Sequence, residues 1–311
     1  MFLQNMLTAF TQVSILMILA AVGFCTHKGN LYTEKTARAC NGLLFYIVTP
    51  SVICHSFIKL ERSEETLSLL GWALLGGFLF HFAGVLITRF LFNRSPATAV
   101  YKYASMYGNM GYMGIPLSQA VLGSTGVFIC SVMVFIFNMF CFTHGAAIMD
   151  RGKNGGINLK KMLINPGTIG LAMGLPIFLL DISLPNVIYQ PLTHLANLNT
   201  PLAMLMLGTY LGATKLGRIF TIKENYLVVL IKLILLPAAT IGTAFLVGVR
   251  GDLLVGFALM SCVPTASNTV MFAAQFEQDT GRAGMAIALN NLFSIFTMPI
   301  WIALAQSLAI S

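Results

Sequence analysis

The chain alternates between long apolar segments and short polar gaps from one end to the other. Each apolar segment has about 20 residues, the length of an α-helix that crosses the hydrocarbon core of a bilayer. A backbone in that environment must satisfy its own hydrogen bonds, so each segment should be helical, with breaks only where protein or water replaces the lost bonds. The pattern predicts ten membrane-spanning helices, at residues 6–27, 38–58, 67–90, 97–121, 126–149, 162–181, 186–212, 225–248, 253–276 and 282–308.

Two of the predicted helices contain polar interruptions. The fourth span is interrupted at Gly108–Pro116 and the ninth at Ser261–Thr269. Inside a helix, glycine costs about 1 kcal/mol relative to alanine and proline about 3 kcal/mol, so both stretches favour a broken helix. A broken helix presents free N–H groups where its second half begins and free carbonyl groups where its first half ends. These interruptions are therefore the parts of the spans best suited to bind a polar ligand.

The two halves of the chain share this organisation. Ser124-Thr125-Gly126 opens the fifth span and Asp279-Thr280-Gly281 opens the tenth, and the two glycines follow Asn109 and Pro264 by the same number of residues. Because five is an odd number of spans, the second half must enter the membrane in the opposite orientation. We predict an inverted repeat, which is typical of secondary transporters. The first repeat is 1–149, the cytoplasmic linker 150–161 and the second repeat 162–311.

Composition and charge agree with a membrane protein. Hydrophobic residues make up 57% of the chain and charged residues only 9%, against about 25% charged in soluble domains. The net charge of +8 does not indicate nucleic-acid binding, because the basic residues are spread over short loops and form no clustered face. Most lie in the odd-numbered loops, so the positive-inside rule places those loops in the cytoplasm and both termini outside the plasma (inner) membrane. Lys232 lies within the eighth span, where we expect it to extend to the cytoplasmic interface unless it has a function in the membrane.

Several polar residues in the interruptions are candidates for binding a substrate. Asn109 lies beside the break of the fourth span, and close helix packing does not explain a buried amide there. Close packing could explain Gly111 and Gly114 as readily as a hinge does. Hydroxyls of the ninth span, such as that of Thr265, can bond to their own helix. Asn268 has no such partner, so we favour a role for it in the site, together with Ser267.

The order of these motifs resembles that of the auxin efflux carrier family, which includes the plant PIN carriers and bacterial transporters of similar length. The resemblance starts from Gly108-Asn109 followed by Gly114-Ile115-Pro116-Leu117. It extends to Asn41–Pro50 in the second span, Thr200-Pro201 in the seventh and Pro264 in the ninth. Each motif is short, but together they cover nearly the whole chain.

The resemblance implies an all-α membrane fold related to the bile-acid sodium symporters and the sodium/proton antiporters. In that fold the broken fourth and ninth helices cross at their centres. Spans one, two, six and seven form a scaffold that also makes a homodimer contact. Spans three to five and eight to ten form a transport unit that moves in an elevator-type cycle.

The resemblance also implies roles for individual residues. Asn109 corresponds to the asparagine that contacts substrate in the family, while plant carriers have proline where this chain has Gly108 and a second proline where it has Thr269. These two departures keep the fold but do not support auxin as the substrate. His55 has the alternative of being a neutral side chain bonded to a neighbouring helix. The substrate-binding candidates are Gly108, Asn109, Ile115, Pro116, Pro264, Thr265, Ser267, Asn268, Ser51 and His55, and the crossover or hinge candidates are Gly111, Gly114, Pro116 and Pro264.

The acidic residues bear on the kind of substrate. All ten Asp and Glu residues lie in loops or near helix ends, whereas a cation antiporter normally keeps a carboxylate at mid-membrane. Half-helix N-termini and amides suit an anion. We therefore predict a carrier of a small organic anion, a mono- or dicarboxylate, in a lipid bilayer. Proton coupling and sodium coupling both stay open.

Two other functions fit the same sequence pattern. A receptor or sensor could use the same pocket without transport, and a sodium-coupled symporter could carry a larger organic acid. An intramembrane enzyme is not expected, because the spans contain no nucleophile with a base in reach, and no metal or cofactor site is indicated.

Overall fold

The computed structural model describes residues 2–89, 91–92, 95, 97–150, 164–213 and 219–310. Those residues are helical apart from connecting turns and one isolated β-bridge. The predicted linker at 150–161 lies outside the described residues except for its first residue. Among the described residues six helical segments are long and apolar enough to cross a membrane, namely Phe2–Lys28, Lys35–Lys59, Glu64–Arg89, Met110–Asp150, Lys223–Leu246 and Thr280–Leu308.

Shorter apolar helices lie at Gly167–Leu179 and Gly251–Cys262. The described residues are therefore helical with apolar segments consistent with a membrane protein, and the count of ten spans in two inverted repeats stays a prediction.

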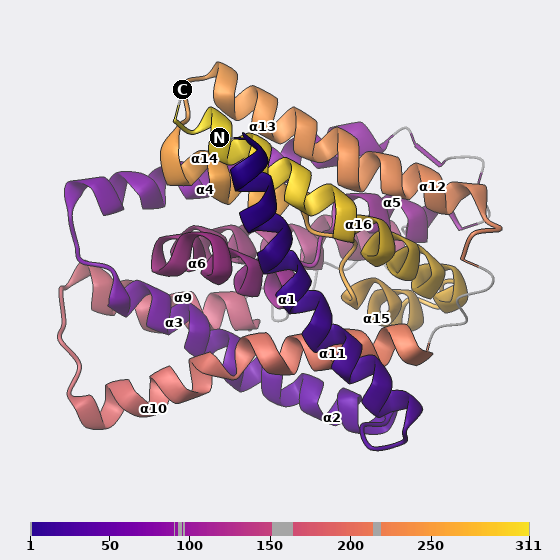
Figure 1. The fold of residues 1–311 in the computed structure, drawn as a ribbon, viewed down its shortest axis with the longest axis horizontal. Helices are drawn as coiled ribbons and strands as arrows, with labels where there is room; N and C mark the ends of the chain where they lie inside the picture. Colours follow the sequence, from indigo (N-terminus) through magenta and orange to yellow (C-terminus); the bar gives the residue numbers. More distant parts are fainter. Residues whose placement is uncertain are drawn as a thin grey trace.

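The first half of the chain folds in the order that the hydrophobic pattern predicts (Figure 1). Gly123 has φ +60° and divides α6 at a kink, close to the boundary predicted between the fourth and fifth spans. The elements are α1 (Phe2–Lys28), α2 (Glu34–Leu43), the π-helical η1 (Leu44–Val48), α3 (Thr49–Lys59), α4 (Glu64–Arg89), α5 (Thr98–Met106), the π-helical η2 (Met110–Gly114), α6 (Ile115–Phe140), the π-helical η3 (Cys141–Gly145) and α7 (Ala146–Asp150).

The second half differs from the predicted pattern at one place. The predicted span 186–212 is two helices that meet at Leu198, because Pro201 has no N–H to give Asn197 and its ring crowds that carbonyl. The elements are α9 (Pro166–Leu179), α10 (Asn186–Asn197), α11 (Asn199–Ala213), α12 (Lys223–Leu230), the π-helical η5 (Ile231–Leu235), α13 (Leu236–Leu246), α14 (Gly251–Cys262), α15 (Asn268–Gln275) and α16 (Thr280–Leu308).

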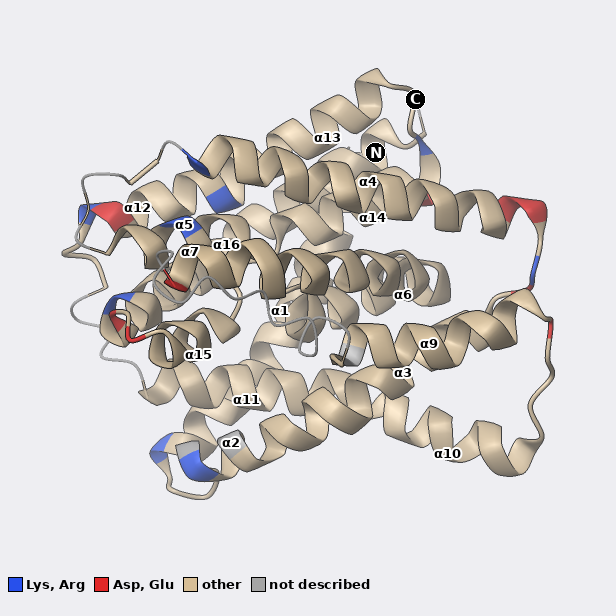
Figure 2. Cartoon of the chain, turned by 180° about the vertical axis from the view of Figure 1, so that it is seen from behind, with Lys and Arg blue, Asp and Glu red and all other residues tan. Residues whose placement is uncertain are grey.

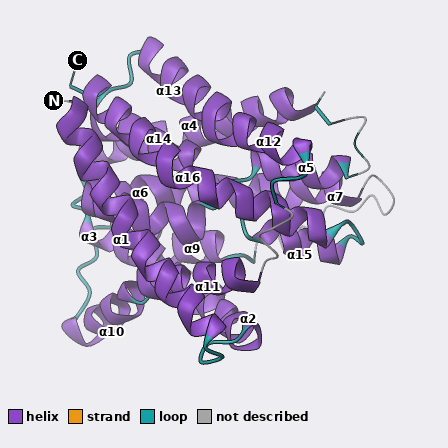
Figure 3. Cartoon of the chain, turned by 45° about the vertical axis from the view of Figure 1, so that its right-hand side comes forward, coloured by secondary structure: helices purple, strands orange, loops and turns teal. Residues whose placement is uncertain are grey.

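The helices pack in two groups. In one, α1 packs against α11 and α3 packs against α9 and α10; in the other, α4 packs against α6, and α14 packs against α6, α13 and α16. Figure 3 shows α10, α11 and α2 at one side of the molecule and α12, α13 and α16 at the other. The groups meet where α1 packs against α16 and α3 packs against α6.

Small residues bring α1 and α11 into close contact. A Cβ atom on Gly208 would overlap the carbonyl oxygen of Ala20, and one on Gly23 would overlap that of Leu205. Close approach through small residues is the usual way for helices to associate in a membrane, where apolar side chains gain little by leaving lipid.

Most charged residues lie at the ends of the helix bundle, and Lys232, described below, is an exception. Figure 2 shows Lys and Arg mainly at the end where α2, α5 and α12 begin, and few at the opposite end, where α3 leads to α4. This asymmetry is the one that the loop pattern predicts. The orientation that follows from it, with both termini outside, stays a prediction.

Candidate functional site

The two interrupted spans meet at their breaks. Helix α5 ends at Met106 and α14 ends at Cys262, and the extended residues that follow them form an antiparallel bridge between Gly108 and Thr265. The N–H of Asn109 donates to the carbonyl oxygen of Pro264 at 2.7 Å, and the N–H of Ala266 donates to that of Tyr107 at 2.9 Å. Each broken helix therefore satisfies backbone groups of the other, as a membrane interior requires.

Thr265 strengthens this pairing. Its hydroxyl donates to the carbonyl oxygen of Ala104 at 2.8 Å, so it bonds to the last turn of the opposite half-helix rather than to its own helix. Pro264 has no N–H and therefore cannot continue α14. Both residues lie at the crossing, as the sequence predicts, and their contacts there hold the two chain segments together.

Asn109 lies where the second half of the fourth span begins. Its carbonyl oxygen accepts the N–H groups of Met113 and Gly114 at 3.0 and 3.1 Å. Its side chain is 6% exposed and makes no hydrogen bond with the described residues. The N–H groups of Gly111 and Tyr112 likewise donate to no acceptor in the described part of the chain. This helix start therefore offers an amide and two N–H donors.

The glycines near Asn109 have different surroundings. A Cβ on Gly111 would meet nothing within 4 Å, whereas one on Gly114 would lie 3.0 Å from the terminal methyl of Met260. Close packing therefore explains Gly114, while Gly111 borders open space. Ile115 and Pro116 are buried at the start of α6.

The two polar residues at the start of α15 are half-buried. Asn268 accepts a hydrogen bond from the Tyr103 hydroxyl at 3.2 Å and donates to Sγ of Cys141 at 3.5 Å. Ser267 precedes α15 without a capping hydrogen bond from its side chain. Asn268 is thus bonded to α5 and η3, and neither residue lines the cavity described next.

A polar cavity of about 400 Å³ reaches Ile115, the first residue of α6 after the break, and none of the crossing residues 107–109 and 263–268, Asn109 included, is among those that line it. Of the predicted site residues, His55 and Ile115 line it. Ser51 does not, and its hydroxyl donates to the carbonyl oxygen of Ile47 in its own helix at 2.8 Å. The walls come from α3, α6, α10 and α11, and the lining residues are Val52, His55, Ser56, Lys59, Ile115, Gln119, Ser124, Val127, Tyr189, Thr193, Ala196, Asn197, Asn199 and Thr200.

Two of these lining residues bear buried polar atoms without a partner. Asn199 is 2% exposed, and neither Nδ2 nor Oδ1 of its amide has a hydrogen bond to the part of the chain that the structure describes. Nε2 of His55 also has none, while the ring stacks on Tyr189 with the centroids 5.5 Å apart. A buried polar group without a partner costs about 1–3 kcal/mol, so these atoms indicate a site that a polar ligand completes.

The sequence interpretation missed Asn199. It directly precedes the motif Thr200-Pro201, and like Asn109 it is an asparagine at a helix break with a proline further along the chain. That repeated context is the signal that could have found it. Gln119 and Lys59 were also missed, because nothing in the apolar pattern brings the ends of the second and fourth spans together.

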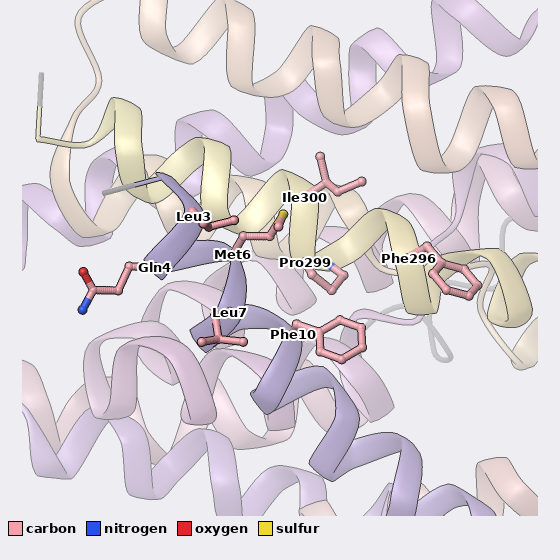
Figure 4. Close-up of a pocket in the computed structure, with 8 residues that line it drawn as sticks. All are labelled: Leu3, Gln4, Met6, Leu7, Phe10, Phe296, Pro299 and Ile300. Atoms are coloured by element: carbon pink, nitrogen blue, oxygen red, sulfur yellow. The ribbon is translucent and has the colours of Figure 1, made fainter.

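A larger hollow of about 820 Å³ lies between the start of α1 and α16 (Figure 4). Its lining is apolar apart from Gln4, and several lining side chains, including those of Leu3 and Phe296, are exposed on the surface. A groove of this kind offers hydrocarbon contact and almost no polar anchor. It is therefore not a candidate for an anion site.

The expectation that Lys232 extends to the cytoplasmic interface is wrong. Its side chain is 0% exposed, and Nζ donates to the carbonyl oxygen of Ser261 at 2.9 Å. The free carbonyl at the end of α14 and the small size of Gly108 give the ammonium a place inside the protein.

Comparison with known proteins finds transporters that match most of the chain. The model of a family described as membrane transport protein matches residues 8–158 and 153–302. An uncharacterized transporter of Methanocaldococcus jannaschii is 24% identical over 299 residues, covering 93% of this chain and 96% of the relative. A putative malonate transporter of Rhizobium meliloti is 25% identical over 272 residues, covering 83% of each. The uncharacterized transporter YfdV of Escherichia coli K12 is 21% identical over 305 residues, covering 94% and 96%.

Proposed function

The chain belongs to the membrane transport protein family, the auxin efflux carrier family that its motifs resemble, and we propose that it is a secondary transporter of a small organic anion. The observation that carries the proposal is the hydrogen-bonded crossing of two broken helices, together with a polar cavity that reaches Ile115 after the first break. Secondary transporters bind their substrates at such discontinuous helices near the bilayer midplane. Membership of a transporter family also argues against an enzyme.

The cavity suits an anion. Among the described residues its lining contains no Asp or Glu and includes Lys59. The free N–H groups of Gly111 and Tyr112 lie outside this lining, at the half-helix start that precedes Ile115. Helix N-termini favour negative charge. The substrate in this proposal bridges the crossing, with Asn109 on one side and the unpaired amide of Asn199 and ring of His55 on the other.

The size of the cavity favours a small substrate. About 400 Å³ is near the lower end of the range of small-molecule sites, which is about 300–1,000 Å³. A short mono- or dicarboxylate fits that volume better than a larger organic acid. The relative named as a putative malonate transporter makes malonate the first compound to test.

The position of the cavity supports an elevator-type movement as part of this proposal. In this proposal α1–α3 and α9–α11 form the scaffold and homodimer contact, and α4–α7 and α12–α16 form the transport unit. The cavity has walls on both, with α3, α10 and α11 on the scaffold side and α6 on the other. Sliding the transport unit past the scaffold would move a substrate held at the crossing from one side of the membrane to the other.

Thermal unfolding of the purified protein tests the site. We expect malonate to raise the unfolding temperature of the wild type, since a ligand that binds only the native state stabilises it by mass action. Asn109→Ala should purify normally and lose that response. Asn5→Ala removes an amide of α1 that makes only a 3.4 Å hydrogen bond to Ser307, so it is the control and should respond as the wild type does. A full response by Asn109→Ala would disprove the site.

Flux separates a carrier from a receptor that uses the same pocket. Proteoliposomes loaded with unlabelled malonate should exchange it for labelled malonate outside. Binding without flux under any imposed gradient would favour the receptor. A screen of mono- and dicarboxylates of increasing length would show whether a larger acid is preferred.

A further inference from the structure

Lys232 is a fully buried lysine in η5, the widened turn between α12 and α13. Its Nζ donates to the carbonyl oxygen of Ser261, in the last turn of α14. The last carbonyls of a helix have no partner within that helix. Together they give its end a negative charge of about half an electron.

Two other carbonyls in the last turns of this helix also accept hydrogen bonds from side chains. The Ser261 hydroxyl donates to the carbonyl oxygen of Ala258 at 3.0 Å, and Sγ of Cys262 donates to that of Leu259 at 3.6 Å. These two groups are neutral. The ammonium of Lys232 is therefore the one charged group among the caps that the structure describes at the end of α14.

The same ammonium touches the other broken helix. A Cβ built on Gly108 would lie 2.9 Å from both Nζ and Cε of Lys232. Nζ also lies over the ring of Phe80 at 5.8 Å from its centroid, within the range of a cation–π contact. Lys232 thus contacts both chain segments of the crossing, and within the described residues no carboxylate forms an ion pair with it.

Burying a cation without a counter-ion is costly, and such residues in membrane proteins are usually functional. In transporters with broken helices, the carbonyl end of a half-helix is where a coupling cation binds. We propose that Lys232 is a built-in cation that occupies this position at the crossing, so that anion transport by this protein needs no sodium. This inference rests on the proposed function. Of the two coupling ions that the sequence allows, it excludes sodium and leaves the proton.

The first test uses stability and needs no transport. Thermal unfolding is measured in sodium, choline and ethylammonium chloride at equal ionic strength. The wild type should unfold at the same temperature in all three, because its cation position is filled. Lys232→Ala should unfold at a lower temperature and recover in ethylammonium, which fits the vacated space, but not in the bulkier choline.

The control is Leu233→Ala, which removes a neighbouring buried side chain that bears no charge. It should lose stability without any recovery in ethylammonium. An unfolding temperature of the wild type that is higher in sodium than in choline would overturn the proposal. A Lys232→Ala variant whose unfolding temperature does not change in ethylammonium would overturn it as well.

If Lys232→Ala does not fold, Lys232→Arg and Lys232→Met replace it. A folded Arg variant beside an unstable Met variant supports the proposal, and a Met variant as stable as the wild type contradicts it.

The second test measures malonate exchange by the wild type in proteoliposomes. The rate should be the same in sodium and in choline, and loss of exchange in choline would refute sodium independence. If malonate and the other carboxylates neither bind nor exchange in any salt, the proposed function fails. The recovery in ethylammonium then still decides whether Lys232 is a built-in cation.

Discussion

Asn199 is the residue whose burial most clearly costs folding free energy. Both atoms of its amide are buried without a partner, which costs about 1–3 kcal/mol. Leucine has nearly the same shape and no polar atoms. We expect Asn199→Leu to raise the unfolding temperature and to abolish the response to malonate, because the amide is kept for the ligand and not for the fold.

The matched control is an asparagine whose amide is used by the fold. Asn165 accepts the N–H of Thr168 at 3.0 Å as the N-cap of α9, and loss of such a cap costs about 1 kcal/mol. Asn165→Leu should therefore lower the unfolding temperature and keep the response to malonate. An Asn199→Leu variant that behaves like this control would show that Asn199 is structural.

His55 allows the polar atom to be separated from the ring. His55→Phe keeps an aromatic ring to stack on Tyr189 and removes Nε2, which has no partner among the described residues. Loss of one hydrogen bond to a charged ligand costs about 1.5–3 kcal/mol, so the dissociation constant for malonate should rise about tenfold or more. Isothermal titration measures it. Unchanged affinity would remove His55 from the site.

At the scale of the helices, proline explains most of the irregular geometry. The π-helical segments η1, η2 and η5 each end two residues before a proline, at Pro50, Pro116 and Pro237. A proline cannot donate to the carbonyl four residues earlier and its ring crowds that group, and a wider turn relieves the clash. The sequence therefore predicts where the spans bend or break, since these causes are local.

Features that depend on distant residues were not predictable in this way. The sequence places Asn109 and Pro264 at breaks, but nothing local shows that Asn199 is buried without a partner. Lys232 was expected at the interface because a long side chain in a span usually reaches water. Its true position depends on the carbonyl of Ser261 and on the space beside Gly108, which arise only when the two halves meet.

Two glycines near the crossing differ in how much space surrounds them. A Cβ on Gly108 would meet Lys232 at 2.9 Å and Cγ2 of Val263 at 3.0 Å, whereas one on Gly111 would meet nothing within 4 Å. Gly108→Ala should therefore lower the unfolding temperature and Gly111→Ala should not. The loss should shrink when Gly108→Ala is made in the Lys232→Ala background, because part of the clash is then absent. Equal effects of the two single substitutions would contradict the packing described here.

At the scale of the whole molecule, transport in the proposed cycle requires the two groups of helices to slide past each other. Ser56 on α3 and Ser131 on α6 face each other across this boundary with their hydroxyl oxygens 3.3 Å apart. Both are buried. A disulfide between cysteines at these positions would fasten the scaffold to the transport unit in the conformation described here.

We expect Ser56→Cys/Ser131→Cys, made after the nearby Cys54 and Cys130 are replaced by alanine, to exchange malonate when reduced and to stop when oxidised. Side-chain sulfur atoms at this spacing can bond with little movement of the backbone. Each single cysteine variant should exchange equally well in both states, which controls for oxidation elsewhere. Ser56 also lines the cavity, so malonate binding is compared between the reduced and the oxidised double variant, and a crosslink that only blocks movement should leave the dissociation constant of the reduced variant unchanged. Undiminished exchange by the fully crosslinked protein would exclude an elevator movement along α3 and α6, and would place the moving boundary elsewhere in the bundle.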